Sequence, residues 1–540
     1  MGRGDTLCGM WKLLLPFVFL LVLVGATVVA DKPRAAADFR FINRGDISTL
    51  DVTQMSWMQD LRMARTLWEG LVRNDIFSWE YRAMPGMAER WERDESGRVW
   101  TFYLREDAKW SDGSPLTAED FLYSWRRVLL PDSLCDYVKM LSDVTGAEEF
   151  SAWRAEATKA FGTDRTIADR PAAAAELWEE TKAKFSELVR VSAPDERTLR
   201  IELERPVPHF LDIAAFPVLY PLKKDLLERY TTINPETGLV QVDPAWTKAG
   251  ALITNGPFKL VSWRFKRDMR LEANEHYWNA KSLAIRSMEI PTVEDGNAQV
   301  LAFKTGAADW VSDVTPPYRG DMIEAKQRYY REHAAEYEKL KAMGLDPIEI
   351  DRRLPPDPRQ NIHAFPAFGV YFLNVNCQPN LPDGRKNPLF DPRVRRALAM
   401  SIDKAAISAS VRRLGEPVSN TLIPTGSITG YESPEGLGFD PEKARELLAQ
   451  AGYPGGEGLI PLEYLFNKDG GHDMIAQAVA RDWQKHLNIK VLLRQKEIKV
   501  FRDDLRAGNF MISRGSWFGD YGSPTTFLDL NKTGDGNNDR

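Results

Sequence analysis

The sequence predicts an α/β protein built from more than one domain. Its 540 residues exceed what one compact core accommodates, so two or three domains are expected. Segments with the alternating pattern of strands are interspersed with segments whose apolar residues recur at helical spacing, which is typical of α/β folds with mixed sheets. This pattern begins again after Phe365, and we place the start of a second lobe there.

The overall composition is that of an ordinary globular protein, with 43% hydrophobic and 27% charged residues. The 71 basic and 77 acidic residues give a formal net charge of -6. This balance, without any run of lysine or arginine, offers no electrostatic footprint for nucleic acid. We therefore expect no nucleic-acid partner.

An export signal is predicted within residues 1-30. The segment from Leu13 to Ala30 is almost wholly apolar and ends in small residues that resemble a cleavage site before Asp31. The apolar run is also long enough to span a bilayer, so an uncleaved membrane anchor stays open as the alternative to a signal peptide. Either form places the rest of the chain in the periplasm or at the cell surface.

The three cysteines have different prospects. Cys8 precedes the apolar run, so it is not placed to become a lipid-modified cysteine. Cys135 and Cys377 lie far apart in the sequence, and we expect two separate buried thiols, with a lone disulfide as the alternative.

The first part of the chain reads as alternating strands and helices. Residues 39-43 form a short strand, a helical pattern runs from Leu61 to Leu71, and residues 100-105 alternate as a strand does. Thr117 and Asp120 have the spacing of a capping box, which predicts that a helix begins there.

Two segments look like helical insertions. Residues 148-190 are rich in alanine and charge, and residues 318-360 carry apolar side chains at helical spacing before a proline-rich run around Pro355. The simplest interpretation of the second insertion is an amphipathic helix packed on the surface. The alternative is a docking element for a partner protein.

The second lobe is expected to alternate in the same way. The predicted elements are a strand at 371-375, helices capped by Asp391 and Asp440, strands at 462-466 and 489-493, and between these two strands a helix centred on Ala480.

The segment from Arg514 to Pro524 contains the residues best suited to binding a ligand. It combines a cation, an acid, aromatic side chains and glycines, which suits a small zwitterion. If the segment is extended, Arg514, Ser516, Phe518 and Asp520 share one face, while Trp517 points to the other. Arg514 and Asp520 would then lie about 20 Å apart, which matches an extended peptide of roughly three to five residues.

Seven segments together resemble the oligopeptide- and dipeptide-type solute-binding proteins of ABC importers, the family 5 extracellular solute-binding proteins. The longest runs from Trp91 to Phe121 and includes Trp110-Ser111-Asp112-Gly113-Ser114-Pro115. The others are residues 203-210, 255-260, 274-279, 306-309, 390-398 and 514-528.

The resemblance implies a two-lobed periplasmic-binding-protein fold of the class II type, with helical insertions. Lobe 1 would have its core in residues 38-66 and 198-364 and an extra subdomain in residues 67-197. Lobe 2 would occupy residues 365-540. Members of this family continue well past the position that corresponds to Asp520-Tyr521, so we expect lobe 2 to be truncated at its C-terminal end.

The resemblance also assigns roles to residues of the site. Asp520 matches the aspartate that pairs with the α-ammonium of a peptide, and Arg514 and His472 match positions used for its carboxylate. Trp517 would line a side-chain pocket. The backbones of two segments would pair with the ligand as an added strand; they are Gly369-Asn374, which includes Tyr371 and Phe372, and Ser516-Phe518.

Each of these four side chains also has a purely structural interpretation. Asp520 lies in a turn-forming sequence, and Arg514 suits a surface ion pair. His472 follows two glycines, so it suits an exposed loop, and Trp517 suits a core position.

The predicted function is capture of short peptides between two lobes and their delivery to the ABC permease subunits in the membrane. The protein would be a monomer, without cofactor, metal or catalytic residue. A secreted hydrolase is the main alternative, although the chain has neither a Gly-x-Ser-x-Gly elbow nor a His-Glu-x-x-His motif. An anchored ligand sensor is a third interpretation. Proteins of the same class also carry nickel, haem, glutathione or sugars, so the ligand stays open.

Overall fold

The computed structural model describes residues 35-43, 45-75, 82-345, 347-355, 362, 367-428, 430-468, 470-533 and 538. The predicted export signal and the lobe boundary at Phe365 lie outside these ranges. Within them, no helix combines the length and the apolarity that a membrane crossing requires.

Lobe 1 is built on a five-stranded mixed sheet with the order β10-β11-β12-β1-β13. The predicted first strand is confirmed as β1, which lies parallel to both of its neighbours, while β10, β11 and β12 pair antiparallel. The strands are β1 (Phe39–Ile42), β10 (Phe258–Arg264), β11 (Asp268–Ala273), β12 (Ser287–Pro291) and β13 (Trp310–Val311), and the nearby helices are α2 (Met58–Leu67) and α8 (Gly296–Lys304). Helix α2 ends at Leu67, before the predicted end at Leu71. The apolar spacing that predicted the longer helix includes Trp68 and Leu71, which are buried in the core although they lie outside the helix.

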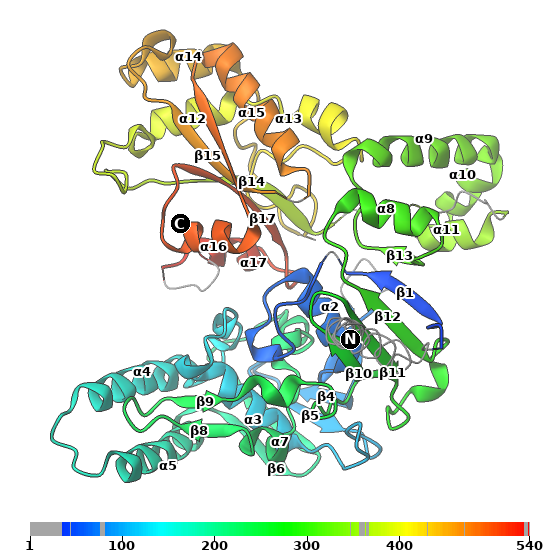
Figure 1. Ribbon diagram of the computed structural model, residues 1–540, viewed down its shortest axis with the longest axis vertical. Helices are drawn as coiled ribbons and strands as arrows, with labels where there is room; N and C mark the ends of the chain where they lie inside the picture. Colours follow the sequence, from blue (N-terminus) through cyan, green and yellow to red (C-terminus); the bar gives the residue numbers. More distant parts are fainter. Residues whose placement is uncertain are drawn as a thin grey trace, which may run out of the picture.

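A second sheet with helices on it forms the extra subdomain of lobe 1 (Figure 1). Its strand order is β4-β5-β7-β6, and the strands are β4 (Ala88–Arg93), β5 (Val99–Leu104), β6 (Val191–Asp195) and β7 (Thr198–Glu202). The predicted capping box is confirmed at the start of α3 (Ala118–Leu129), where the Thr117 backbone N–H donates to Asp120 Oδ2. Strand β7 extends this sheet beyond residue 197, the predicted end of the subdomain.

The two predicted insertions are both helical. The first forms the hairpin of α4 (Ala147–Thr163) and α5 (Arg170–Leu188), which projects from the extra subdomain (Figure 1). The second forms α9 (Pro316–Glu332), α10 (Ala334–Ala342) and α11 (Pro347–Arg353). Instead of one surface helix, these three helices share a small core of their own, which contains Tyr329, Leu340 and Ile350.

Short elements complete lobe 1 and its subdomain. They are β2 (Val72–Asn74), β3 (Ala83–Pro85), α6 (Phe210–Ala214), α7 (Lys224–Glu228), β8 (Thr231–Ile233) and β9 (Val240–Val242). Strands β2 and β3 form one two-stranded sheet, and β8 and β9 form another.

Lobe 2 is built on a four-stranded sheet with the order β14-β17-β15-β16, in which β14 is an edge strand. The strands are β14 (Gly369–Val375), β15 (Leu462–Asn467), β16 (Val491–Lys496) and β17 (Ile512–Phe518), and the helices are α12 (Pro392–Met400), α13 (Lys404–Ala406), α14 (Pro441–Gln450), α15 (His472–Leu487), α16 (Ile498–Arg506) and α17 (Thr525–Leu528). Asp391 and Asp440 cap α12 and α14 as predicted. Strand β16 begins two residues later than expected, at Val491 instead of Ile489.

The lobes have separate hydrophobic cores, but the end of β17 and the segment after it pack into the core of lobe 1. Most buried apolar residues of lobe 2 form one cluster around its sheet. Tyr521, however, is buried in the core cluster of lobe 1, and Trp517 packs against that same cluster. The C-terminal end of β17 therefore inserts into lobe 1.

The two described cysteines are free, as expected of separate thiols. The prediction that both are buried is wrong for Cys377. This residue follows the edge strand β14 and is exposed, because the chain leaves the sheet there.

Candidate functional site

The predicted ligand segment is extended only in its first part, from Arg514 to Phe518. Strand β17 reaches from Ile512 to Phe518, and in its second half Ser516 and Phe518 are exposed while Trp517 between them is half-buried. The chain leaves the strand at Gly519, whose backbone N–H donates to Phe368 O. Asp520 is thus held just beyond the end of the strand.

The two backbone segments predicted to bind a ligand pair with each other. Strands β14 and β17 are antiparallel over their whole length, with Gly369 opposite Phe518 and Tyr371 opposite Ser516. On the other edge of β17, strand β15 pairs only as far as Ser513. Among the described strands, none pairs with this second edge of residues 515-518.

Asp520 of lobe 2 lies beside an aromatic group of lobe 1. Burial, followed by the charge of the Asp520 carboxylate, raises the pKa of Tyr137 well above its ordinary value. The ring of Tyr137 also lies 6.4 Å from that of Trp517 and 4.7 Å from that of Phe216, centroid to centroid. One acidic group and three aromatic rings therefore meet where the lobes touch.

The turn after Asp520 is fixed from both lobes. Within lobe 2, Asp520 N donates to Thr526 Oγ1 at 2.9 Å. Across the lobes, Gly522 N donates to Asp212 Oδ2 at 3.1 Å, and the ring of Tyr521 stacks on that of His209 at 4.6 Å and 5°. These contacts hold the backbone of Asp520 and of the turn after it in place.

Arg514 lies at the other end of the segment and inside lobe 2. Its Nε donates to Asn467 Oδ1 at 2.7 Å, and its guanidinium carbon lies 4.8 Å from the ring centroid of Phe501. The side chain is half-buried between β15 and α16 and is not fully exposed at the surface.

His472 is not in a loop. It is the first residue of α15, follows Gly471 in the left-handed conformation (φ +72°), and is only 8% exposed, so the alternative of an exposed loop histidine is wrong. Its Nδ1 lies 3.4 Å from the Tyr371 hydroxyl, and the two rings stack at 5.7 Å. Burial raises the pKa of Tyr371.

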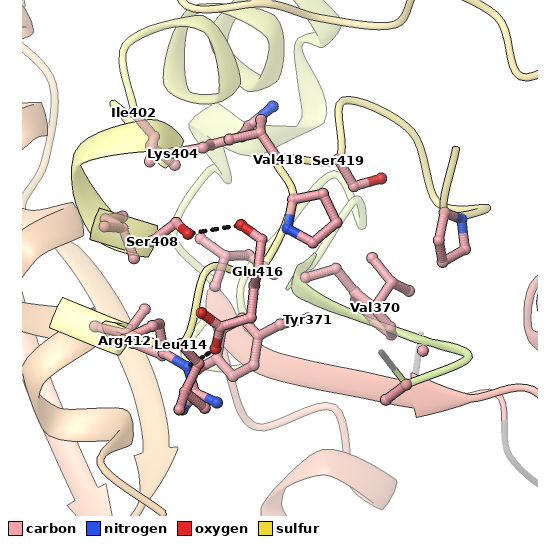
Figure 2. A pocket seen from close by; sticks show the side chains of 18 of the residues that line it. Val370, Tyr371, Ile402, Lys404, Ser408, Arg412, Leu414, Glu416, Val418 and Ser419 are labelled. Atoms are coloured by element: carbon pink, nitrogen blue, oxygen red, sulfur yellow. Dashed lines mark hydrogen bonds and ion pairs between the residues drawn. The ribbon is translucent and has the colours of Figure 1, made fainter. Parts of the chain in front are cut away.

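A cavity of about 1890 Å³ lies between the lobes on the β14 side of the sheet. Tyr371 and Phe372 line it, together with β13, α9 and the loop that follows α13. Figure 2 shows the Arg412 guanidinium against the Glu416 carboxylate, at 2.9 Å from Nε to Oε1, and Lys404 near Val418. Asp520, Trp517, Ser516 and Phe518 do not line this cavity.

The eight predicted site residues therefore fall into two groups. Asp520 and Trp517 lie at the contact with the extra subdomain, and Ser516 and Phe518 are exposed on β17, whereas Arg514, His472, Tyr371 and Phe372 lie deeper in lobe 2 or along its edge strand. Within the described ranges, no group of three or more histidine, cysteine, aspartate or glutamate residues is arranged to hold a metal.

Sequence reasoning missed Tyr137 and Asp212, which come from the extra subdomain and its surroundings. Both are more than 300 residues from the Asp520 motif, and nothing local marks them as site residues. It also missed Lys404, Arg412 and Glu416 of the cavity, which come from α13, from the π-helix Ile407–Arg412 and from the irregular segment after it, because no motif marks them in the sequence.

Residues 82-539 match the bacterial extracellular solute-binding proteins, family 5 Middle. The chain belongs to this family. The resemblance drawn from the sequence motifs is thereby confirmed, as is the two-lobed fold. Family 5 proteins are extracellular, which supports export of this chain.

Three proteins illustrate how similar this family 5 chain is to known members. The periplasmic oligopeptide-binding protein OppA of Salmonella typhimurium is 28% identical over 96% of this chain and 82% of its own length. The structure of the murein tripeptide-binding protein MppA of Escherichia coli matches with a TM-score of 0.70 and 27% identity, over 93% of this chain and 83% of that one. The unliganded open form of MppA matches with a TM-score of 0.54 and 26% identity, over 93% and 82%.

Proposed function

We propose that this protein is the substrate-binding component of an ABC importer and that it captures short peptides between its two lobes. The observation that carries the proposal is the position of Asp520, a carboxylate of lobe 2 beside Tyr137 of lobe 1, whose ring contacts those of Trp517 and Phe216. The similarity to oligopeptide- and murein peptide-binding proteins supports a peptide ligand. Delivery to permease subunits and a monomeric state are part of the proposal.

Asp520 is proposed to bind the α-ammonium group of the peptide. A carboxylate partly enclosed by apolar rings attracts a cation more strongly than it would in water, because the local dielectric is lower. The rings of Trp517 and Tyr137, which contact each other, provide an apolar surface beside this position. The first side chain of the ligand would pack there.

The open edge of β17 is proposed to bind the peptide backbone. Residues 515-518 pair with β14 on one side only among the described strands, and an extended peptide would pair with their other side. Main-chain pairing is independent of side chains, which suits a carrier of varied peptides. The second predicted segment, Gly369-Asn374, would contribute indirectly, by holding β17 straight.

The carboxylate end of the ligand is proposed to be read from the cluster of Arg514, His472 and Tyr371. Arg514 is a half-buried cation of β17, its Nε donates to Asn467 Oδ1, and its positive charge acts on the Tyr371 hydroxyl beside His472. The chain is extended from Arg514 to Phe518, and Asp520 follows two residues later. The proposed sites for the two ends of the ligand, at Arg514 and at Asp520, are therefore separated by about the length of a short peptide.

Identification of the bound ligand tests the proposal. Mass spectrometry of what co-purifies with the exported protein should detect peptides of about three to five residues. Calorimetric titration with such peptides should show that Asp520→Asn weakens binding by roughly 30- to 5000-fold, because a buried ammonium loses its counter-charge. Asp503→Asn removes an exposed acid of the same lobe and should bind like the wild type.

Two results would contradict the proposal. One is recovery of only sugars or a metal chelate from the purified protein, and the other is equal affinity of the two variants. Peptides incubated with the protein should also be returned intact, since cleavage would favour the secreted hydrolase. Recovery of the protein from membranes after salt washing would indicate an anchor instead of a cleaved signal.

A further inference from the structure

Helix α16 presents two arginines on one face. Phe501 and Leu505 are buried in a small cluster with Leu465 and Phe510, which fixes the helix to lobe 2. Arg502 and Arg506 each follow one of the buried residues and are four residues apart, so they lie one above the other. Figure 1 shows α16 on the side of lobe 2 that faces lobe 1.

Both arginines contact lobe 1. The guanidinium carbon of Arg502 lies 4.2 Å from the ring centroid of Trp57, the residue that precedes α2. Arg506 Nη2 lies 3.8 Å from Asp136 Oδ1, next to Tyr137 of the candidate site. These contacts join the lobes through a helix that is not part of the ligand segment.

The charge of Arg502 also acts on neighbouring groups of lobe 1. Burial raises the pKa of Asp60 to about 6, and the positive charge of Arg502 acts in the opposite direction. The same charge opposes the rise in the pKa of Tyr137. Arg502 therefore lies among Trp57, Asp60 and Tyr137, where it is attracted by both a ring face and a carboxyl group.

We propose that Arg502 and Arg506 of α16 form a latch that holds lobe 2 against lobe 1 before any ligand binds. The latch rests on the proposed function, because it sets the fraction of the protein in which the two halves of the peptide site are already together. Arg502 and Arg506 are positioning residues: they affect peptide binding only by setting how close the two lobes lie. The TM-score is higher for the first MppA structure, at 0.70, than for the unliganded open form of MppA, at 0.54, which agrees with lobes that are in contact.

Arg502 is the stronger half of the latch. A cation over a tryptophan face contributes more as water is excluded from it, and the Arg502 side chain is only half-exposed. The Arg506 side chain is 58% exposed, and an ion pair of that kind contributes little. Removing Arg502 should lower the ratio of closed to open protein roughly threefold to tenfold.

Small-angle X-ray scattering of the unliganded full chain tests the latch. Arg502→Ala should have a larger radius of gyration than the wild type, and Arg502→Lys should lie in between because it keeps the positive charge. Lys499→Ala removes an exposed cation from the same helix and should scatter like the wild type. Peptide affinity should fall in the same order, because the closed fraction multiplies the intrinsic affinity.

A second variant protects the test against misfolding. Trp57→Leu removes the ring from lobe 1 and should expand the protein as Arg502→Ala does, while the double variant should expand it no further. Identical scattering of wild type and Arg502→Ala, or fully additive effects, would overturn the latch whatever the titrations give. Failure of every variant, wild type included, to bind peptide would instead overturn the proposed ligand and leave the scattering result standing.

Discussion

The ring of Trp517 in lobe 2 contacts the ring of Tyr137 in lobe 1, at 6.4 Å from centroid to centroid, although the two residues are 380 positions apart in the chain. This pair of rings lies next to Asp520, whose charge acts on the Tyr137 hydroxyl. Replacing Trp517 by alanine should therefore weaken peptide binding by about tenfold, since one wall of the proposed side-chain pocket is lost.

Titration calorimetry with a series of tripeptides that differ in their first residue would measure this effect. The loss should be largest for aromatic first residues. Trp153→Ala, at a half-buried tryptophan on α4, is the matched control and should leave affinity unchanged. An equal loss for every first residue would contradict a side-chain pocket at Trp517.

Asp212 supports the turn that carries Asp520. Its carboxylate accepts the Gly522 N–H from the other lobe, at 3.1 Å. Asp212→Ala removes this acceptor, so we expect roughly a fivefold weaker peptide affinity from one lost hydrogen bond. Asp212→Asn keeps an oxygen acceptor and should bind nearly as the wild type does. If both variants bind equally weakly, the charge and not the hydrogen bond is what matters.

Asp60 makes stability depend on pH. Burial raises its pKa from 3.8 to about 6, so the folded state holds the proton more tightly than the unfolded chain does. This group stabilises the fold most below pH 4, and the contribution is lost as the pH rises to 6. Asp60→Asn keeps the oxygen that accepts the Ser48 N–H and should raise the free energy of unfolding by about 1 to 3 kcal/mol at pH 7.5.

Urea unfolding at pH 4, 5, 6 and 7.5 would measure this change. The advantage of Asp60→Asn should shrink toward zero at pH 4. A constant difference at all four values would mean that the Asp60 carboxyl does not titrate in this range.

The extra subdomain depends on a buried ion pair. Arg154 Nη2 and Asp132 Oδ2 lie 2.6 Å apart, and both side chains are almost completely inaccessible to solvent. Asp132→Ala leaves a buried, unpaired guanidinium and should destabilise the fold by about 3 to 5 kcal/mol. Chemical unfolding would measure this, with Glu156→Gln on the exposed face of α4 as the control expected to change nothing.

Local signals predicted most of the fold correctly. The capping box at Thr117, the aspartate caps of α12 and α14 and the alternation along β17 all act within a few residues, so the sequence alone reveals them. His472 was misplaced because two glycines suggest a loop, whereas Gly471 here adopts the left-handed conformation from which α15 starts. Tyr137 was missed because its role exists only once the two lobes are brought together.

The exposed thiol of Cys377 gives a way to follow these movements. Burial raises the pKa of the Cys135 thiol to about 12, so that group stays protonated and unreactive at neutral pH. Cys377 is exposed and lines the cavity between the lobes. Of the two described cysteines, it alone should react with a maleimide fluorophore, and the emission of that dye would report in real time how the lobes close around a ligand.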